Sequence, residues 1–212
     1  MLRLSKLPQS IAIFLLLFSL PTTADMAPAE HLVELLQGIE ALHARYEQTG
    51  QQEMQTGEFW LRKPNQFRLE SAPPLSQTIV SDGYSLWTHD RDLEQVIVST
   101  LNTQAEDIPL LLFAGEPGRL KDSFMVEYFE DGQHDYFVLT PLEEGGMVVG
   151  IALAFQDDLP VKISFESAMN EQTIIHLLDV SQLLADDTSF DYQIPDGVDV
   201  IDDRRPDVSI SD

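Results

Sequence analysis

The sequence predicts a mostly β protein built on one strongly curved antiparallel sheet, with a few helices. After Gly50 the chain consists of short apolar runs separated by turn signals, which is typical of β-strands. Two of these turns, at Asp82-Gly83 and Asp131-Gly132, carry the residue pair that favours tight hairpins. One apolar stripe with helical spacing precedes the strands. A single helix followed by consecutive hairpins favours one curved sheet.

The first residues have the pattern of a secretory signal peptide. Arg3 and Lys6 give a basic start, residues 11–20 are almost continuously apolar, and Thr22-Thr23-Ala24 supplies small residues for cleavage. The apolar run is too short for a comfortable membrane span. We therefore expect residues 1–24 to be a cleaved signal peptide and residues 25–212 to form a single domain. The chain contains no cysteine, so its core alone must stabilise it in an oxidising compartment.

The charge of the chain excludes some classes of partner. It carries 36 acidic and 12 basic residues, a formal net charge of −24. Such a charge argues against nucleic acid or an anionic lipid surface as a partner. Two explanations remain open. The acidic surface is either an adaptation to a salty exterior, where screening tolerates self-repulsion, or a solubilising surface without a specific role.

The predicted helix covers residues 29–47. Its apolar residues recur at helical spacing and form one stripe, and Gly38 weakens the helix without interrupting that stripe. The stripe consists of Leu32, Leu35, Leu36, Ile39, Leu42 and Tyr46. We expect this segment to be the one long amphipathic helix of the protein.

A short apolar segment at residues 106–116 interrupts the strand pattern. It contains Ile108, Leu110, Leu111, Leu112 and Phe113, with Pro109 as a candidate helix start. It is too short to span a membrane and too continuous to be one face of an exposed helix. Two interpretations are open: a core helix that plugs one end of a barrel, or a lid over an apolar cavity.

No catalytic motif is recognisable in the sequence, and we expect neither an enzyme nor a cofactor. The five histidines do not cluster, and His43 lies beside the helical stripe, where it is expected at a helix edge. A group of acidic residues and one histidine could bind a cation, but it lacks the spacing of a calcium loop, so a solvated hairpin turn is the preferred interpretation. That group is Glu127, Glu130, Asp131, His134 and Asp135. Trp60 and Trp87 fall in predicted strands and are expected to pack.

The ordered set of motifs resembles the periplasmic outer-membrane lipoprotein carrier family, LolA. The set comprises "GEFWLRKPNQFRLE", "SDGYSLWTHDRDLEQ", a short apolar helix after a proline, "YFVLTP" and "FDYQIPDGVDVIDD". The resemblance implies an incomplete, half-open antiparallel β-barrel whose mouth is covered by a long N-terminal helix and a short lid helix. It further implies a periplasmic chaperone that carries lipoproteins from an inner-membrane ABC transporter to an outer-membrane receptor lipoprotein. We expect a monomer that shields acyl chains and binds no nucleic acid.

The resemblance also assigns roles to residues. The acyl-chain cavity would be lined by Leu32, Leu36, Ile39, Phe59, Leu61, Leu110, Leu111 and Phe113. The family typically closes its lid with an arginine before a proline, a position that Lys63 occupies here. Strand alternation places Lys63 on the face of Phe59 and Leu61, and Arg62 on the other face. We therefore expect the Lys63 ammonium to reach the C-terminal end of the short helix, around Phe113 and Ala114.

Three other functions remain as alternatives. The same fold would serve a periplasmic carrier or sensor of another amphiphile, such as a glycolipid-like molecule. A regulatory sensor of lipoproteins usually carries a further domain or an anchor. A hydrolase of lipid-like substrates would need a serine or histidine, for example His43 or His89, near the mouth of the cavity.

Overall fold

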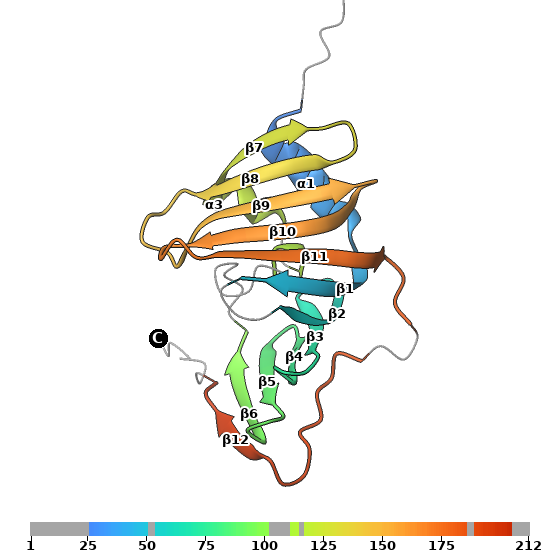
Figure 1. Ribbon diagram of the computed structural model, residues 1–212, viewed down its shortest axis with the longest axis vertical. Helices are drawn as coiled ribbons and strands as arrows, with labels where there is room; N and C mark the ends of the chain where they lie inside the picture. The colour runs from blue at the N-terminus through green and yellow to red at the C-terminus, as the bar shows by residue number, and fades with distance from the viewer. Residues whose placement is uncertain (1–25, 51–53, 102–110, 115–116, 186–188, 205–212) are drawn as a thin grey trace, which may run out of the picture.

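One continuous sheet dominates the protein (Figure 1). The computed structural model describes residues 26–50, 54–101, 111–114, 117–185 and 189–204, so the expected signal peptide lies outside the described residues. Among the described residues, none of the helices has the length and apolar character needed to cross a membrane.

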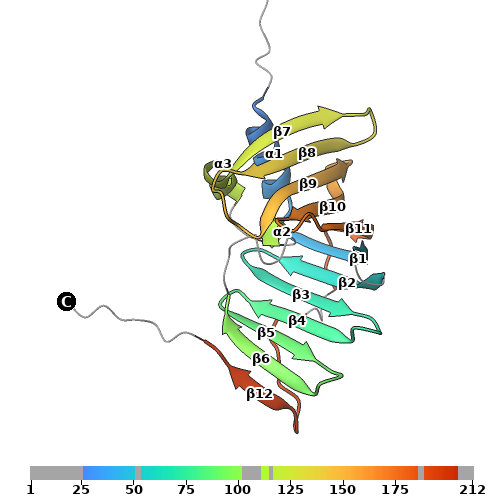
Figure 2. The ribbon, with the colours of Figure 1, turned by 60° about the vertical axis from the view of Figure 1, so that its left-hand side comes forward.

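Twelve strands form the sheet in the order β12-β6-β5-β4-β3-β2-β1-β11-β10-β9-β8-β7. The first six are β1 (Ala41–Thr49), β2 (Gln55–Arg62), β3 (Gln66–Ser71), β4 (Gln77–Asp82), β5 (Ser85–Asp90) and β6 (Gln95–Thr100). The others are β7 (Phe124–Glu130), β8 (Asp135–Pro141), β9 (Val148–Gln156), β10 (Leu159–Ser167), β11 (Gln172–Ser181) and β12 (Asp199–Asp202). Neighbouring strands are antiparallel except for β12, which runs parallel to β6. The two end strands, β7 and β12, are not paired with each other, so the sheet stays open (Figure 2). The predicted half-open antiparallel sheet is thus confirmed.

Asp-Gly turns form the predicted hairpins. At the β4–β5 turn, the Asp82 carboxylate accepts hydrogen bonds from the backbone N–H groups of Tyr84 and Ser85, both at 2.8 Å. Gly83 adopts a φ of +103°, which glycine reaches without steric cost. Asp131 plays the same part at the β7–β8 turn, where Gly132 has a φ of +83°. The two sequence signals therefore mark hairpins for a local chemical reason.

The expected long helix over residues 29–47 is wrong in its second half. The helix α1 spans only Pro28–Gly38, and Ile39 is already extended. The chain then enters β1 at Ala41. Leu42, Ala44 and Tyr46 are buried while the residues between them are less so, which is the period of a strand. Leu42 and Tyr46 fit a helical spacing and a strand spacing equally well, and this ambiguity extended the prediction too far.

Three shorter helical elements follow β6: α2 (Leu111–Ala114), η1 (Pro117–Arg119) and α3 (Leu120–Ser123). Together with α1 they lie on one side of the sheet, which we call the inner face (Figure 2). The hydrophobic core fills the space between these helices and the inner face. It includes residues of α1 and α2 as well as inward-facing residues of β1, β2 and β8–β11.

The outer face of β4–β6 is also covered. Val80, Val96 and Val98 alternate with inward-facing residues on these strands, yet each is at most 3% exposed. Residues 189–204, which we call the C-terminal segment, pass over this face and end in β12 (Figure 1). Phe190 of this segment is 2% exposed, and Tyr192 lies against Trp87 and His89. The outer face of this half of the sheet is therefore buried, whereas Ile97, on the inner face of β6, is 39% exposed.

Candidate functional site

The structure brings together most of the residues that the resemblance assigns to the cavity. Leu32 and Leu36 come from α1, Ile39 follows it, Phe59 and Leu61 come from β2, and Phe113 comes from α2; none is more than 1% exposed. All six belong to one cluster on the inner face. Leu110 lies outside the described residues, and Leu111 begins α2 without a described side chain. The six described residues thus form one continuous apolar site under α1.

Aromatic residues that the sequence analysis did not single out complete this site. Phe155 on β9 makes edge-to-face contacts with Phe113 at 6.3 Å and with Phe137 at 5.8 Å between ring centroids. His31 of α1 contacts the rings of Tyr128 and Phe137 at 5.0 and 5.2 Å. These rings join α1 and α2 to the β7–β9 side of the sheet. The alternation of apolar residues in β8 and β9 was the available signal for Phe137 and Phe155.

The apolar site is closed in this conformation. Because the side chains from α1, α2 and β2 are essentially fully buried, they have no surface left to offer a ligand. A ligand that reaches Phe59 or Leu61 must displace α1 or α2 from the inner face. The apolar site is thus the part of the hydrophobic core that lies between the sheet and the helices α1 and α2.

Lys63, which directly follows β2, connects this strand to the end of α1. Its ammonium donates a hydrogen bond to the carbonyl of Leu36, in the last turn of α1, and its backbone N–H donates to the Glu40 carbonyl at 3.0 Å. Burial lowers the pKa of Lys63 from its ordinary value, while the nearby Glu40 carboxylate acts in the opposite direction. A cation at the C-terminal end of a helix also interacts favourably with the helix dipole.

The expected partner of Lys63 is wrong. The described hydrogen bond goes to α1 instead of the neighbourhood of Phe113 and Ala114 on α2. The principle of a cation at a helix C-terminus holds, but the long helix was expected to run on to residue 47, so its real end near Leu36 was not considered. Arg62, by contrast, lies on the outer face as expected. Its guanidinium bonds Gln66 at 2.8 Å and lies 4.7 Å from the centroid of the Phe190 ring.

A second tie joins α1 to the helices after β6. The Lys121 ammonium of α3 lies 3.2 Å from a carboxylate oxygen of Glu30, in the first turn of α1. Both side chains are largely exposed, so this ion pair contributes little to stability in water. It nevertheless positions the N-terminal end of α1 beside α3, opposite the end that Lys63 holds.

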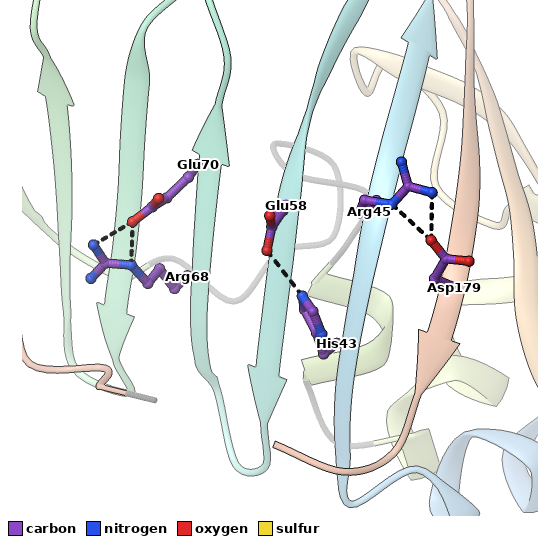
Figure 3. Close-up of polar contacts among 6 residues, drawn as sticks. All are labelled: His43, Arg45, Glu58, Arg68, Glu70 and Asp179. Atoms are coloured by element: carbon purple, nitrogen blue, oxygen red, sulfur yellow. Dashed lines mark hydrogen bonds and ion pairs between the residues drawn. The ribbon is translucent and has the colours of Figure 1, made fainter. Parts of the chain in front are cut away.

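The histidines considered for catalysis lie on the other side of the sheet. His43 is on β1, not on a helix, and its ring stacks on Trp60 and lies 3.1 Å from Glu58 (Figure 3). The His89 ring bonds the Tyr192 hydroxyl at 2.6 Å under the C-terminal segment. Both therefore face away from the apolar site, and neither supports a lipid hydrolase.

The acidic group around residues 127–135 belongs to a hairpin. Hydrogen bonds from the backbone N–H groups of Gln133 and His134 lower the pKa of Asp131. Tyr136 also donates its hydroxyl hydrogen to Asp131 at 3.0 Å. In the part of the chain that the structure describes, no three or more His, Asp or Glu residues are grouped to hold a metal ion.

The fold and the site define a class of protein: one open, curved antiparallel sheet with an apolar inner face that short helices cover. Residues 37–193 match the family model "Outer membrane lipoprotein carrier protein LolA". The chain is 34% identical over 190 residues to the outer-membrane lipoprotein carrier protein of Hahella chejuensis, covering 84% of this chain and 90% of the relative. It is 32% identical to the protein of the same name from Chromohalobacter salexigens, over 86% of this chain and 91% of the relative.

This chain therefore belongs to the LolA family of outer-membrane lipoprotein carriers, whose members are periplasmic and not enzymes. Solved structures agree on the fold alone. An uncharacterized conserved protein from Thermus thermophilus aligns with a TM-score of 0.56 and 12% identity, over 84% of this chain and all of that one. MucB aligns with a TM-score of 0.53 and 14% identity, over 84% of this chain and 66% of that chain.

Proposed function

We propose that this protein carries lipoproteins across the periplasm and encloses their acyl chains between the inner face of the sheet and the covering helices. It would receive them from an inner-membrane ABC transporter and deliver them to an outer-membrane receptor lipoprotein, after export through a cleaved signal peptide. Family membership supports the cargo class. The observation that carries the proposal is the fully buried apolar site beneath α1, whose last turn accepts a hydrogen bond from the Lys63 ammonium.

The energetics of the cargo explain why such a site is needed. Three acyl chains of roughly 16 carbons hold about 45 CH₂ groups, and at about 0.8 kcal/mol each their exposure to water costs about 36 kcal/mol. No lipoprotein would cross an aqueous compartment unaided at that cost. A carrier that bound the chains with all of this energy would not release them either.

Closure of the empty site supplies the opposing free energy. When cargo leaves, Leu32, Leu36 and Ile39 return to the inner face, and the Lys63 ammonium regains the Leu36 carbonyl. A hydrogen bond to a charged group contributes about 1.5–3 kcal/mol, from which the desolvation of the ammonium subtracts. A shift of about 2 kcal/mol changes the ratio of open to closed protein about thirtyfold. Lys63 would therefore tune release more than uptake.

The first experiment measures opening directly. Because the chain has no cysteine, a Leu36→Cys variant places one reporter thiol at a fully buried position of α1. We expect slow reaction with a maleimide, and faster reaction when Lys63→Leu is added. Tyr84→Cys, at a side chain that is 83% exposed, is the matched control and should react at one rate in both backgrounds. Equal rates at position 36 with and without Lys63 would rule out its role in closure.

The second experiment measures transfer from the loaded carrier to vesicles that bear the receptor. Lys63→Leu should accept lipoprotein normally but deliver it more slowly, because the closed state no longer competes with the loaded one. Lys63→Arg should retain delivery, since it keeps the cation. Arg62→Leu on the outer face is the control and should deliver normally. Normal sorting of lipoproteins in cells depleted of the protein would refute the carrier function itself.

An alternative is a carrier or sensor of another amphiphile, such as a glycolipid-like molecule, which the same apolar site would accommodate. Mass spectrometry of the natively purified protein separates the two, because a lipoprotein and a glycolipid differ in their bound mass. Only glycolipid in the bound fraction would favour the alternative.

A further inference from the structure

The edge strand β7 differs from the edge strand at the other end of the sheet. It is seven residues long and pairs with β8 on one side, while no strand among the described residues pairs with its other side (Figure 2). The opposite edge, β12, is four residues long and has aspartates at both ends. Short, charged edges resist pairing with further strands, whereas a longer edge with apolar side chains invites it.

The outer face of β7 carries two large apolar side chains. Met125 and Phe129 are each 53% exposed, and the Phe129 ring stacks on Tyr136 of β8 with centroids 4.9 Å apart. Strand alternation places Glu127 on the same face, midway between them. The residues between, Val126 and Tyr128, pack against the core instead. The exposed row therefore reads apolar, acidic, apolar.

Glu127 prevents this row from pairing with its own copy. Two β7 strands related by a two-fold axis would pair antiparallel about their common centre, which is Glu127. Met125 would then lie opposite Phe129 of the second copy, a favourable pair, but Glu127 would lie opposite itself. Like charges directly opposite in a strand pair are destabilising. One residue thus selects against self-association while the apolar pair remains available.

The charge around β7 indicates what the edge accepts. Residues 124–167 contain nine acidic residues and a single basic one, Lys162. Hydrogen bonds to the turn keep the pKa of Asp131 low, so the charge next to the strand persists into acid. An anionic membrane surface would be repelled by this region, whereas a cationic polypeptide would be attracted.

We propose that β7 is a docking edge for an extended strand of another protein with the pattern apolar-x-basic-x-apolar. The two apolar side chains would contact Met125 and Phe129, the basic one would face Glu127, and the backbone would extend the sheet. The pattern reads the same in both directions, so a parallel or an antiparallel strand would satisfy it. This inference concerns a partner protein and does not depend on the identity of the cargo.

A peptide titration tests the proposal. The probe is the peptide Thr-Val-Thr-Arg-Thr-Val-Thr, added to the purified full-length mature protein while backbone amide NMR signals are recorded. We expect saturable shifts confined to β7 and β8. The same peptide with Glu in place of Arg should bind at least about threefold more weakly, because one cross-strand charge pair changes sign. A peptide with N-methylated amides along one edge should not bind, since it cannot extend a sheet.

Two variants make the test decisive. Glu127→Lys should reverse the preference, binding the Glu peptide better than the Arg peptide. Glu127→Val should form dimers at high protein concentration, measured by analytical ultracentrifugation, because the repulsion at the centre of the strand pair is gone. Glu47→Val, at an exposed position of β1 inside the sheet, is the matched control and should leave the protein monomeric. Absent or unsaturable shifts, shifts centred away from β7, or an unchanged preference in Glu127→Lys would each overturn the proposal.

Discussion

The two halves of the sheet differ in what covers their outer face. Over β4–β6 the C-terminal segment covers Val80, Val96 and Val98, and on the adjacent strand β3 Arg68 pairs with Glu70 of the same strand (Figure 3). Over β7–β9 nothing among the described residues covers Met125 or Phe129. Charge follows the same division: residues 41–100 carry eight acidic and five basic residues, against nine and one in residues 124–167.

The two halves also differ in what packs against their inner faces. Of its described residues, the half that the C-terminal segment covers contributes only Ile79 and Leu86 to the margin of the inner-face core. The half with the bare outer face receives α1 on its inner side, where His31 contacts Tyr128 and Phe137. The helix α1 thus packs on the half with the bare outer face, and the C-terminal segment packs on the other half.

The same substitution in both halves should have the largest difference in effect. Phe190→Ala removes a side chain that is 2% exposed and should lower the free energy of unfolding by about 3–5 kcal/mol. Phe129→Ala removes one that is 53% exposed and should cost less than about 1 kcal/mol. Urea denaturation measures both. Equal losses would mean that the C-terminal segment does not stabilise the half that it covers.

Two glycines offer a second paired test. A Cβ at Gly57 on β2 would lie 2.1 Å from the Glu70 carbonyl oxygen and 2.6 Å from the Tyr46 ring, so Gly57→Ala should destabilise by about 1–3 kcal/mol. A Cβ at Gly150 on β9 meets no atom within 4 Å, and Gly150→Ala should be neutral or slightly stabilising. Thermal denaturation compares the two. A tolerated Gly57→Ala would show that the packing around Tyr46 is looser than described.

Tyrosine hydroxyls give a smaller contrast. Tyr192→Phe loses the hydrogen bond to His89 Nδ1 under the C-terminal segment and should cost about 1 kcal/mol. Tyr136→Phe loses an exposed bond to Asp131 and should cost a few tenths of a kcal/mol at most. Chemical denaturation of the two variants at neutral pH measures both costs. A larger loss for Tyr136→Phe would reverse the ranking of the two halves.

The smallest expected effect is a loss of stability at alkaline pH, caused by Tyr46 and Tyr192. Burial raises the pKa of both Tyr46 and Tyr192 above the ordinary value. The folded state then holds its phenolic protons more tightly than the unfolded state, so stability is full below about pH 10 and falls as the pH rises beyond it. Denaturation curves between pH 8 and 11 should show this fall, and Tyr192→Phe should make it shallower. An identical pH dependence in wild type and variant would remove Tyr192 as a contributor.

Local chemistry allowed most of the strands and turns to be predicted from the sequence. The Asp-Gly hairpins, the turn at Lys63-Pro64-Asn65 and the alternation of Phe59 and Leu61 depend on neighbouring residues, and the structure has them all. The end of α1 was missed, because Leu42 and Tyr46 satisfy two periods and Ala44, the residue that distinguishes them, is small and favours helices.

Features that depend on distant parts of the chain were not predictable in this way. The parallel pairing of β12 with β6 joins segments about a hundred residues apart, and nothing in residues 199–202 specifies that partner. The partner of Lys63 depended in turn on the misplaced end of α1. The clustering of the expected apolar residues was predictable because apolar side chains meet in a core, whereas their individual contacts required the fold.

The attachment of α1 to the sheet determines how the cover can move. Only Ile39 and Glu40 separate α1 from β1, a strand in the middle of the sheet, and the Lys63 backbone N–H holds the Glu40 carbonyl at 3.0 Å. An outward movement of α1 would therefore pivot beside Lys63. Its 11 residues give an arm of about 16 Å, so a rotation of about 30° would move Pro28 by about 8 Å and the Leu36 carbonyl by about 3 Å, enough to part it from the Lys63 ammonium. Cargo would thus enter from the Glu30 end, past α3, where the helix moves furthest.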